Sequence, residues 1–211
     1  VQNGVLERYS VSRASGLGLR VQVDGRDGYA YTEALEDAET LVLRAADNAR
    51  CIEDTDAHPM QTQQTYRCVS PAVSPLAALS EEERIELARQ MEADVLDADP
   101  RIKKTVHSMV SCGSGRIALE NARGLSAARA YSAGSIYVEA VAEQDGEVQT
   151  GGGFRMFSEA LDVRGCAQEA VDDALARLGG RPTPSGAYPV ILRNTAMADL
   201  LAAFTGIFSA E

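Results

Sequence analysis

An antiparallel β-meander is predicted near the start of the chain from the alternation of apolar and polar residues. Between residues 17 and 23 every second residue is apolar, namely Leu17, Leu19, Val21 and Val23. This period of two is typical of a strand with one buried face. Asp24-Gly25 and Asp27-Gly28 favour turns, and the sequence at 29–31 predicts a returning strand. Residues 5–12 are expected to form a further strand before them.

Three other segments have apolar residues at helical spacing. The first follows Asp37, a residue type that caps helix N-termini, and runs to about Ala49. The second begins with Ser80-Glu81-Glu82-Glu83, a capping-box signature, and runs to about Leu96. The third spans residues 162–178 and is followed by two glycines, as helix C-termini commonly are. We expect these helices to cover one face of the predicted sheets.

A second antiparallel sheet, of about four strands, is predicted for residues 101–158. Turns are expected at Cys112–Gly115, at Arg123-Gly124 and at Asp145-Gly146, of which the last is a strong hairpin signal. Gly151–Gly153 either allow a ligand to approach the backbone or mark a bend in a strand, and we favour the bend.

The last stretch of the chain has a strand pattern followed by a helix pattern. Tyr188–Leu192 predict a short strand, and a helix is expected after it. Its apolar stripe consists of Met197, Leu200, Leu201, Phe204 and Phe208. No capping glycine, basic last turn or proline follows before Glu211. We therefore expect this stretch to open a further domain whose remainder is absent.

These patterns predict an α+β fold of antiparallel β-meanders covered by helices, followed by the first strand and helix of a further domain. The expected organisation is a meander with a helix in residues 1–52, a connecting loop in 53–79, a helix–sheet–helix unit in 80–180, and the start of a truncated C-terminal domain in 187–211.

Composition and charge exclude several functional classes. The net charge of −11 disfavours a nucleic-acid-binding surface, which needs clustered Lys and Arg. No apolar run is long enough for a transmembrane helix, and no signal-peptide pattern is visible. We expect a cytoplasmic protein without a membrane or nucleic-acid partner.

Few residues suggest chemistry of their own. The four cysteines lie at positions 51, 68, 112 and 166, with no pair at metal-ligand spacing, so reduced thiols are expected. The acidic cluster Glu53, Asp54, Asp56 and His58 allows a metal site, but a solvated loop is the favoured interpretation. No nucleophile elbow, phosphate loop or His-Glu-x-x-His is present. From motifs alone we assign no catalytic, metal-binding or cofactor-binding residue.

The order of the elements resembles the TldD/PmbA family, whose members are often labelled modulators of DNA gyrase. The resemblance lies in the segments GLGLRVQVDGRDGYAYT, ENARGLSA, GGGFRMF and YPVILRNTAMADLLAAFTGIFSAE. It extends over essentially the whole chain and corresponds to roughly the N-terminal half of the family's usual length.

The resemblance implies a role for the last helix. In the TldD branch the helix after the Pro-Val strand carries His-Glu-x-x-x-His, which binds a catalytic metal, expected to be zinc. The matching positions here are Ala202, Ala203 and Ile207, which cannot bind a metal or transfer a proton. The chain therefore resembles the PmbA branch, also called TldE, whose members lack the motif.

A family resemblance of this kind implies a non-catalytic subunit. Members of the two branches form a heterodimeric metalloprotease that cleaves unfolded peptides, including microcin precursors and an antitoxin, and the metal belongs to the TldD-type partner. Two alternatives remain open: a peptidase that uses residues beyond Glu211, or a homodimeric peptide-binding scaffold.

Overall fold

The computed structural model describes residues 1–34, 37–53, 58–66, 73–157 and 161–209. The chain divides into two compact units, residues 1–178 and residues 179–211. Helices and antiparallel sheets of two and three strands make up the structure, so the predicted α+β class is confirmed.

The first unit begins with a two-stranded hairpin. Strands β1 (Leu17–Val23) and β2 (Arg26–Thr32) pair antiparallel through a tight turn in which Asp24 and Gly25 both have positive φ, 50° and 75°. Asp27-Gly28 lie within β2, so the turn predicted there is wrong. The strand predicted for residues 5–12 is also wrong, because among the described residues this segment has no ladder partner and makes one isolated bridge, from Val5 to Gln2.

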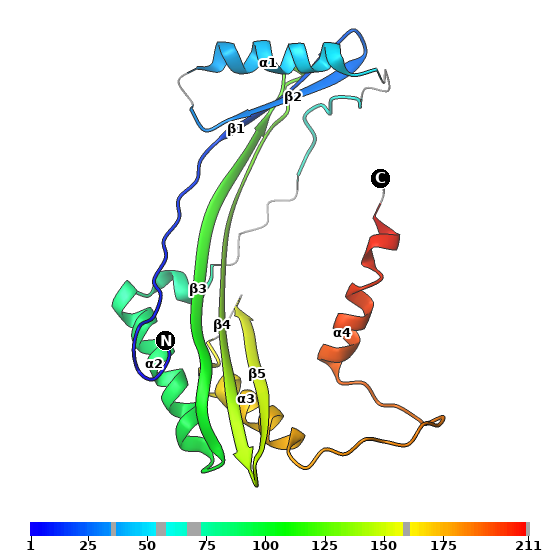
Figure 1. The fold of residues 1–211 in the computed structure, drawn as a ribbon. Helices are drawn as coiled ribbons and strands as arrows, with labels where there is room; N and C mark the ends of the chain where they lie inside the picture. Colours follow the sequence, from blue (N-terminus) through cyan, green and yellow to red (C-terminus); the bar gives the residue numbers. More distant parts are fainter. Residues whose placement is uncertain (35–36, 54–57, 67–72, 158–160, 210–211) are drawn as a thin grey trace. The chain divides into compact units, whose positions relative to one another are not determined.

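Helix α1 (Ala38–Cys51) packs against this hairpin (Figure 1). The predicted cap is confirmed, since the Asp37 carboxylate accepts a hydrogen bond of 3.1 Å from the Thr40 backbone N–H. Gly28 allows the close approach: a Cβ there would lie 2.0 Å from the Ala45 carbonyl oxygen. The buried side of the helix is formed by Leu41, Ala45 and Ala49.

The second sheet has three strands in the order β3–β4–β5. They are β3 (Ile102–Glu120), β4 (Ser126–Gln144) and β5 (Glu147–Phe157). The turns at Gly124 and at Asp145-Gly146 are confirmed, with positive φ at all three residues. The turn predicted at Cys112–Gly115 is wrong: β3 continues through it in register with β4. The Tyr131 ring occupies the space above Gly115, so this glycine is packed within the ladder.

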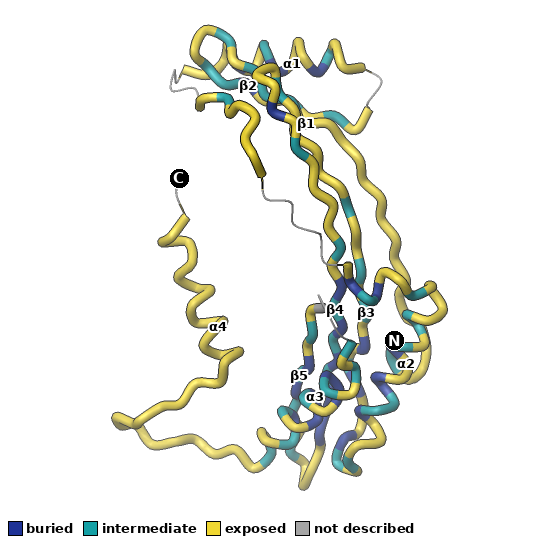
Figure 2. Tube along the Cα trace, turned by 180° about the vertical axis from the view of Figure 1, so that it is seen from behind, coloured by how far each residue is buried: buried dark blue, intermediate teal, exposed yellow. Residues whose placement is uncertain are grey.

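Helices cover one face of this sheet, which we call the inner face. They are the short 3₁₀ helix η1 (Pro75–Ala78), α2 (Glu81–Ala98) and α3 (Val163–Arg177). Figure 2 shows α3 lying across the sheet. The predicted capping box of α2 is confirmed, with Ser80 and Glu83 bonded reciprocally. The central core is formed by Leu76, Met91, Val95, Ile136, Val138, Ala140, Ala142, Cys166, Ala170 and Val171.

The glycines in β5 serve the packing of α3. A Cβ on Gly151 would lie 2.1 Å from the Ala174 nitrogen, and one on Gly153 would lie 1.9 Å from the Cys166 carbonyl oxygen. The predicted bend is wrong, because β5 pairs with β4 without a register shift. The glycines therefore allow the helix backbone to lie against the strand. Glycines that serve close packing and glycines that mark a bend give the same sequence pattern, so the sequence could not distinguish the two roles.

The opposite face, which we call the outer face, is apolar and exposed. Register places odd-numbered residues of β4 on it, with their partners on β3 and β5. It carries all the exposed large apolar side chains described for these strands: Met109, Ile117, Leu119, Tyr131, Val148, Phe154 and Met156.

A buried carboxylate joins the N-terminal turn to α2 and β3. Glu92, 3% exposed, accepts hydrogen bonds from the backbone N–H groups of Asn3 and Gly4, each at 2.7 Å, and from the Thr105 hydroxyl at 2.6 Å. Burial opposes its ionisation, yet these three hydrogen bonds outweigh burial and lower the pKa of Glu92.

The second unit contains α4 (Asn194–Ala202) and the 3₁₀ helix η2 (Thr205–Phe208). Residues 188–192 form no strand, so that prediction is wrong, and the predicted single helix is interrupted after Ala202. The described part of this unit offers residues 188–192 no ladder partner, and an isolated strand has nothing to satisfy its backbone groups.

Replacing Gly153 with Ala should destabilise the protein by about 1–3 kcal/mol, since the new methyl group displaces α3. Gly152→Ala is the matched control. Its Cβ would face outward with the nearest atom, on Tyr137, at an ordinary 3.4 Å, and its effect should stay within about 0.5 kcal/mol. Urea unfolding of the two variants measures the difference, and equal losses would contradict the assigned packing role.

Glu92→Gln should cost about 1–3 kcal/mol at neutral pH, because an amide cannot accept from all three donors. The pKa of Glu92 is lowered on folding, so the stabilisation is complete above the unfolded pKa of about 4.3 and is lost as pH falls through the folded pKa. Unfolding measured from neutral to acidic pH should therefore show the gap between wild type and variant closing. Exposed Glu86→Gln is the control, and a gap that stays constant with pH would refute the account.

Candidate functional site

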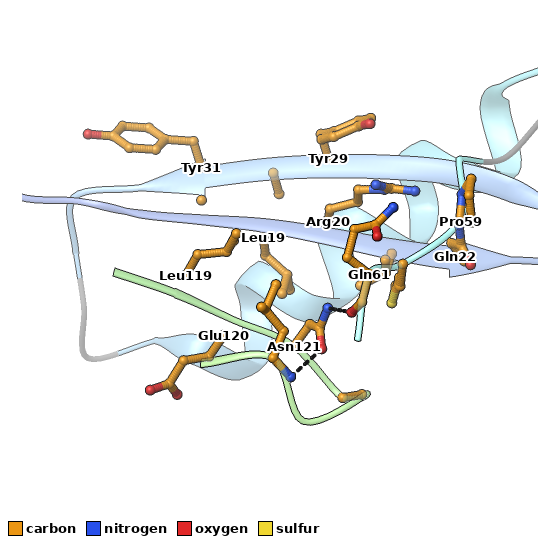
Figure 3. A pocket seen from close by; sticks show the side chains of 16 residues that line it. Leu19, Arg20, Gln22, Tyr29, Tyr31, Pro59, Gln61, Leu119, Glu120 and Asn121 are labelled. Atoms are coloured by element: carbon orange, nitrogen blue, oxygen red, sulfur yellow. Dashed lines mark hydrogen bonds between the residues drawn. The ribbon is translucent and has the colours of Figure 1, made fainter. Parts of the chain in front are cut away.

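A groove of about 940 Å³ lies along β1 in the first unit. The β1–β2 hairpin, the segment 59–61 and the end of the β3–β4 hairpin form its walls (Figure 3). Its polar and aromatic lining includes Arg20, Gln22, Tyr29, Tyr31, Gln61 and Asn121. Figure 3 shows Tyr29 and Tyr31 projecting from one side of the hairpin, while Leu19 points toward Leu119. The volume lies within the range of small-molecule sites.

One wall of the groove is a segment held in place by Asp27. The Asp27 carboxylate accepts a hydrogen bond of 3.0 Å from the His58 backbone N–H and forms an ion pair of 3.0 Å with Arg20. The side chains of Arg20 and Gln22 also donate to the His58 carbonyl oxygen. Three side chains of the hairpin thus fix the chain that enters the groove wall at Pro59.

The charge state of Asp27 follows from these contacts. Burial raises its pKa, whereas hydrogen bonds from the His58 backbone, Gln22 and Arg20 lower it, and the net shift is downward. Asp27 is therefore ionised at neutral pH and is held by a permanent cation. This arrangement suits a structural anchor better than a general acid or base, whose pKa lies near the working pH.

Asn121 fastens the other end of the same wall. Its side-chain oxygen accepts from the backbone N–H groups of Arg123 and Leu125, at 2.9 and 3.1 Å, while its amide donates to the Gln61 carbonyl at 2.7 Å. The Gln63 side chain accepts from the Ser126 N–H at 2.8 Å. Sequence reasoning missed Asn121 and Asp27, because their partners lie 60 and 31 residues away along the chain.

The positions that match the family's metal motif lie in the second unit. Ala202 is the last residue of α4, Ala203 caps it, and Ile207 lies in η2. Their side chains carry no nitrogen, oxygen or sulfur, so this set of residues does not fit a metal. The predicted apolar stripe of this helix, from Met197 to Phe208, is exposed within the chain.

The other residues considered from the sequence are scattered. His58 takes part in the Asp27 cluster, whereas Asp54 and Asp56 lie outside the described residues. Cys51, Cys112 and Cys166 are free thiols, and burial raises the pKa of Cys166 to about 11. Within the described ranges no three His, Cys, Asp or Glu side chains are placed to share a metal ion. No described helix is long and apolar enough to cross a membrane.

Similar proteins share this fold over almost the whole chain. A modulator of DNA gyrase from Thermotoga maritima aligns with 97% of this chain and 47% of its own, with a TM-score of 0.88 and 24% identity. TldE from Thermococcus kodakarensis aligns with 83% of this chain and 40% of its own, with a TM-score of 0.72 and 18% identity. These likenesses establish the fold.

Sequence comparisons agree with the structural ones. The metalloprotease TldD homolog of Haemophilus influenzae is 24% identical over 208 residues, which cover 91% of this chain and 42% of that protein. The chain thus spans less than half the length of these relatives.

Family models match residues 1–49 as PmbA/TldA metallopeptidase domain 1 and residues 74–178 as the PmbA/TldA metallopeptidase central domain. Two consecutive domains of one family, in the family's order, account for most of the chain, which therefore belongs to the PmbA/TldD metallopeptidase family.

Proposed function

We propose that the chain is a non-catalytic, PmbA/TldE-like subunit of a TldD/TldE-type metalloprotease that acts on unfolded peptides, of which microcin precursors and antitoxins are the implied examples. Its role is to help hold an extended peptide beside the metal of a TldD-type partner. The proposal follows from family membership together with the character of the residues that replace the metal motif.

The observation that carries the proposal is the set Ala202, Ala203 and Ile207. A metallopeptidase needs ligands for the ion and a carboxylate to activate water. None of these three side chains can do either. The backbone also departs from one continuous helix there, because α4 ends at Ala202 and η2 begins at Thr205. A metal supplied by a partner subunit would provide the Lewis acid that this set lacks.

The groove along β1 supports a peptide-holding role. The Gln61 side-chain amide can donate to and accept from a peptide backbone of any sequence, and the tyrosines can pack against apolar side chains. Of the described strands only β2 pairs with β1, so backbone groups along the other edge of β1 face the groove wall. Asp27 and Asn121 keep that wall in place without taking part in acid–base chemistry.

Peptide cleavage should require both subunits. The chain alone should bind no stoichiometric zinc and should leave an unstructured test peptide intact, whereas a mixture with a TldD-type subunit should cleave it. Metal analysis of the purified chain and mass spectrometry of the peptide measure these outcomes. Stoichiometric zinc together with cleavage by the chain alone would overturn the proposal, as would failure of the chain to bind any TldD-type subunit.

Removing the groove's aromatic side chains should weaken peptide binding. Tyr29→Ala with Tyr31→Ala should raise the dissociation constant for a labelled unstructured peptide about tenfold, which is roughly 1.4 kcal/mol. Fluorescence anisotropy measures the affinity. Val42→Ala, on an exposed position of α1 that does not line the groove, is the control. Equal affinities for the double variant and wild type would remove the groove from the proposal.

A further inference from the structure

Residues 58–66, which we call the strap, cross from the β1–β2 hairpin to the tip of the β3–β4 hairpin (Figure 3). The two hairpins bind the backbone of the strap through four side chains: Asp27, Arg20, Gln22 and Asn121. The groups that they bind are the N–H and carbonyl of His58 and the carbonyl of Gln61. Because these contacts are made to backbone groups, an extended segment of another sequence can make them too.

The strap does not extend the sheet beside it. Among the described residues β1 pairs with β2 alone, and no backbone-to-backbone hydrogen bond joins the strap to β1. The outward N–H and C=O groups of β1 therefore have no ladder partner in the part of the chain that the structure describes. An edge of this kind accepts an added strand.

Little apolar surface holds the strap in place. Met60 is half-buried and lines the groove, whereas every other residue of the strap is exposed. The Gln63 side chain adds one contact at the far end, where it accepts a hydrogen bond of 2.8 Å from the Ser126 N–H. A segment with so few buried contacts opens at a low cost in free energy.

The strap also leaves part of the hairpin's hydrogen-bonding capacity unused. The contacts of Asp27 with His58 and Arg20 all use one carboxylate oxygen, Oδ2. The other oxygen, Oδ1, and the Nε of Arg20 are buried and have no hydrogen-bond partner among the described residues, and the Asp27 side chain is only 10% exposed. Buried polar atoms without a partner are costly, so a ligand backbone that reaches them gains bonds that the strap does not make.

We infer that the strap is a built-in stand-in for the peptide ligand, and that an extended peptide displaces it and adds as a strand to the free edge of β1. The inference rests on the proposed function, because it concerns the regulation of the same peptide-holding groove. A tethered segment competes at a high effective concentration, so the closed strap weakens the binding of a free peptide.

The strap indicates which class of peptide fits. Its sequence, HPMQTQQTY, contains no aspartate, glutamate, lysine or arginine. The charges that face it cancel, since Arg20 and Asp27 form an ion pair. The fitting ligand is therefore an extended segment with uncharged side chains, recognised through its backbone.

Loosening the strap should strengthen peptide binding. Met60→Ala with Gln63→Ala removes the half-buried side chain and the contact to Ser126, and it leaves the side chains that bind the strap's backbone unchanged. The dissociation constant for a labelled peptide of sequence HPMQTQQTY should fall about tenfold, as expected if the wild-type strap is open about one-tenth of the time. Fluorescence anisotropy with the full chain measures the affinity, and circular dichroism checks that the variant is folded.

The matched control is Thr62→Ala with Gln64→Ala. Both residues are exposed strap positions that do not line the groove, so this variant should bind the peptide like the wild type. If the strap is a fixed wall, Met60→Ala with Gln63→Ala removes a contact from the groove and weakens binding. Unchanged or weaker binding by that variant, relative to the wild type, overturns the inference.

Amide hydrogen exchange followed by NMR tests displacement in the wild type, without any substitution. In the closed strap the His58 N–H is bonded to Asp27 and the Ser126 N–H to Gln63. Saturating peptide should speed exchange at His58 and slow exchange at outward amides of β1. Exchange at His58 that slows or stays the same on peptide binding contradicts displacement of the strap.

The two levels of the proposal can fail separately. If Tyr29→Ala with Tyr31→Ala weakens peptide binding while the strap variant does not strengthen it, the groove holds peptide beside a fixed wall and only the present inference fails. If neither pair of substitutions changes the affinity, the groove has no part in peptide binding and both ideas about it fail.

Discussion

The close packing of α3 against β5 is the contact on which the first unit depends. Two glycines, Gly151 and Gly153, let the helix backbone approach the strand to a distance that no side chain allows. Because α3 lies so close, the small inner-face residues of β4 can bury completely beneath it. Close packing of this kind leaves no room for an added methyl group without movement of the helix.

The same packing leaves the sheet with two unlike faces. Helices and a buried core occupy the inner face, while the outer face exposes apolar side chains from every strand. The strands β3 and β4 are also much longer than β5, so their shared ladder extends beyond the helices and reaches the groove beside β1. One long ladder therefore connects the core, the outer face and the candidate site (Figure 1).

The function proposed for this chain depends on binding surfaces and on what replaces the metal motif. Asp27 and Asn121 illustrate the point, because each is a polar residue at the groove whose hydrogen bonds hold a loop. A catalytic carboxylate would need a raised pKa or a free partner, whereas Asp27 has a lowered pKa and an arginine beside it. In the proposed function the site positions a ligand, and a partner's metal would supply the chemistry.

Local signals in the sequence determined the caps, the tight turns and the family. Asp37, the Ser80–Glu83 box and Asp145-Gly146 act through hydrogen bonds and backbone preferences within a few residues, so they could be identified without a fold. The family relationship could be identified because it rests on the order of segments. The absence of metal ligands at Ala202, Ala203 and Ile207 was likewise visible from residue type alone.

Tertiary structure decided the features that depend on distant partners. Cys112–Gly115 have turn composition but continue as a strand, because β4 supplies a ladder partner for each residue. Gly151–Gly153 look like a bend until α3 is placed against them. Glu92 lies on a predicted helix, and its partners at Asn3, Gly4 and Thr105 come from two other parts of the chain. Such contacts join residues 13 to 89 positions apart, a range over which hydrophobic periodicity carries no information.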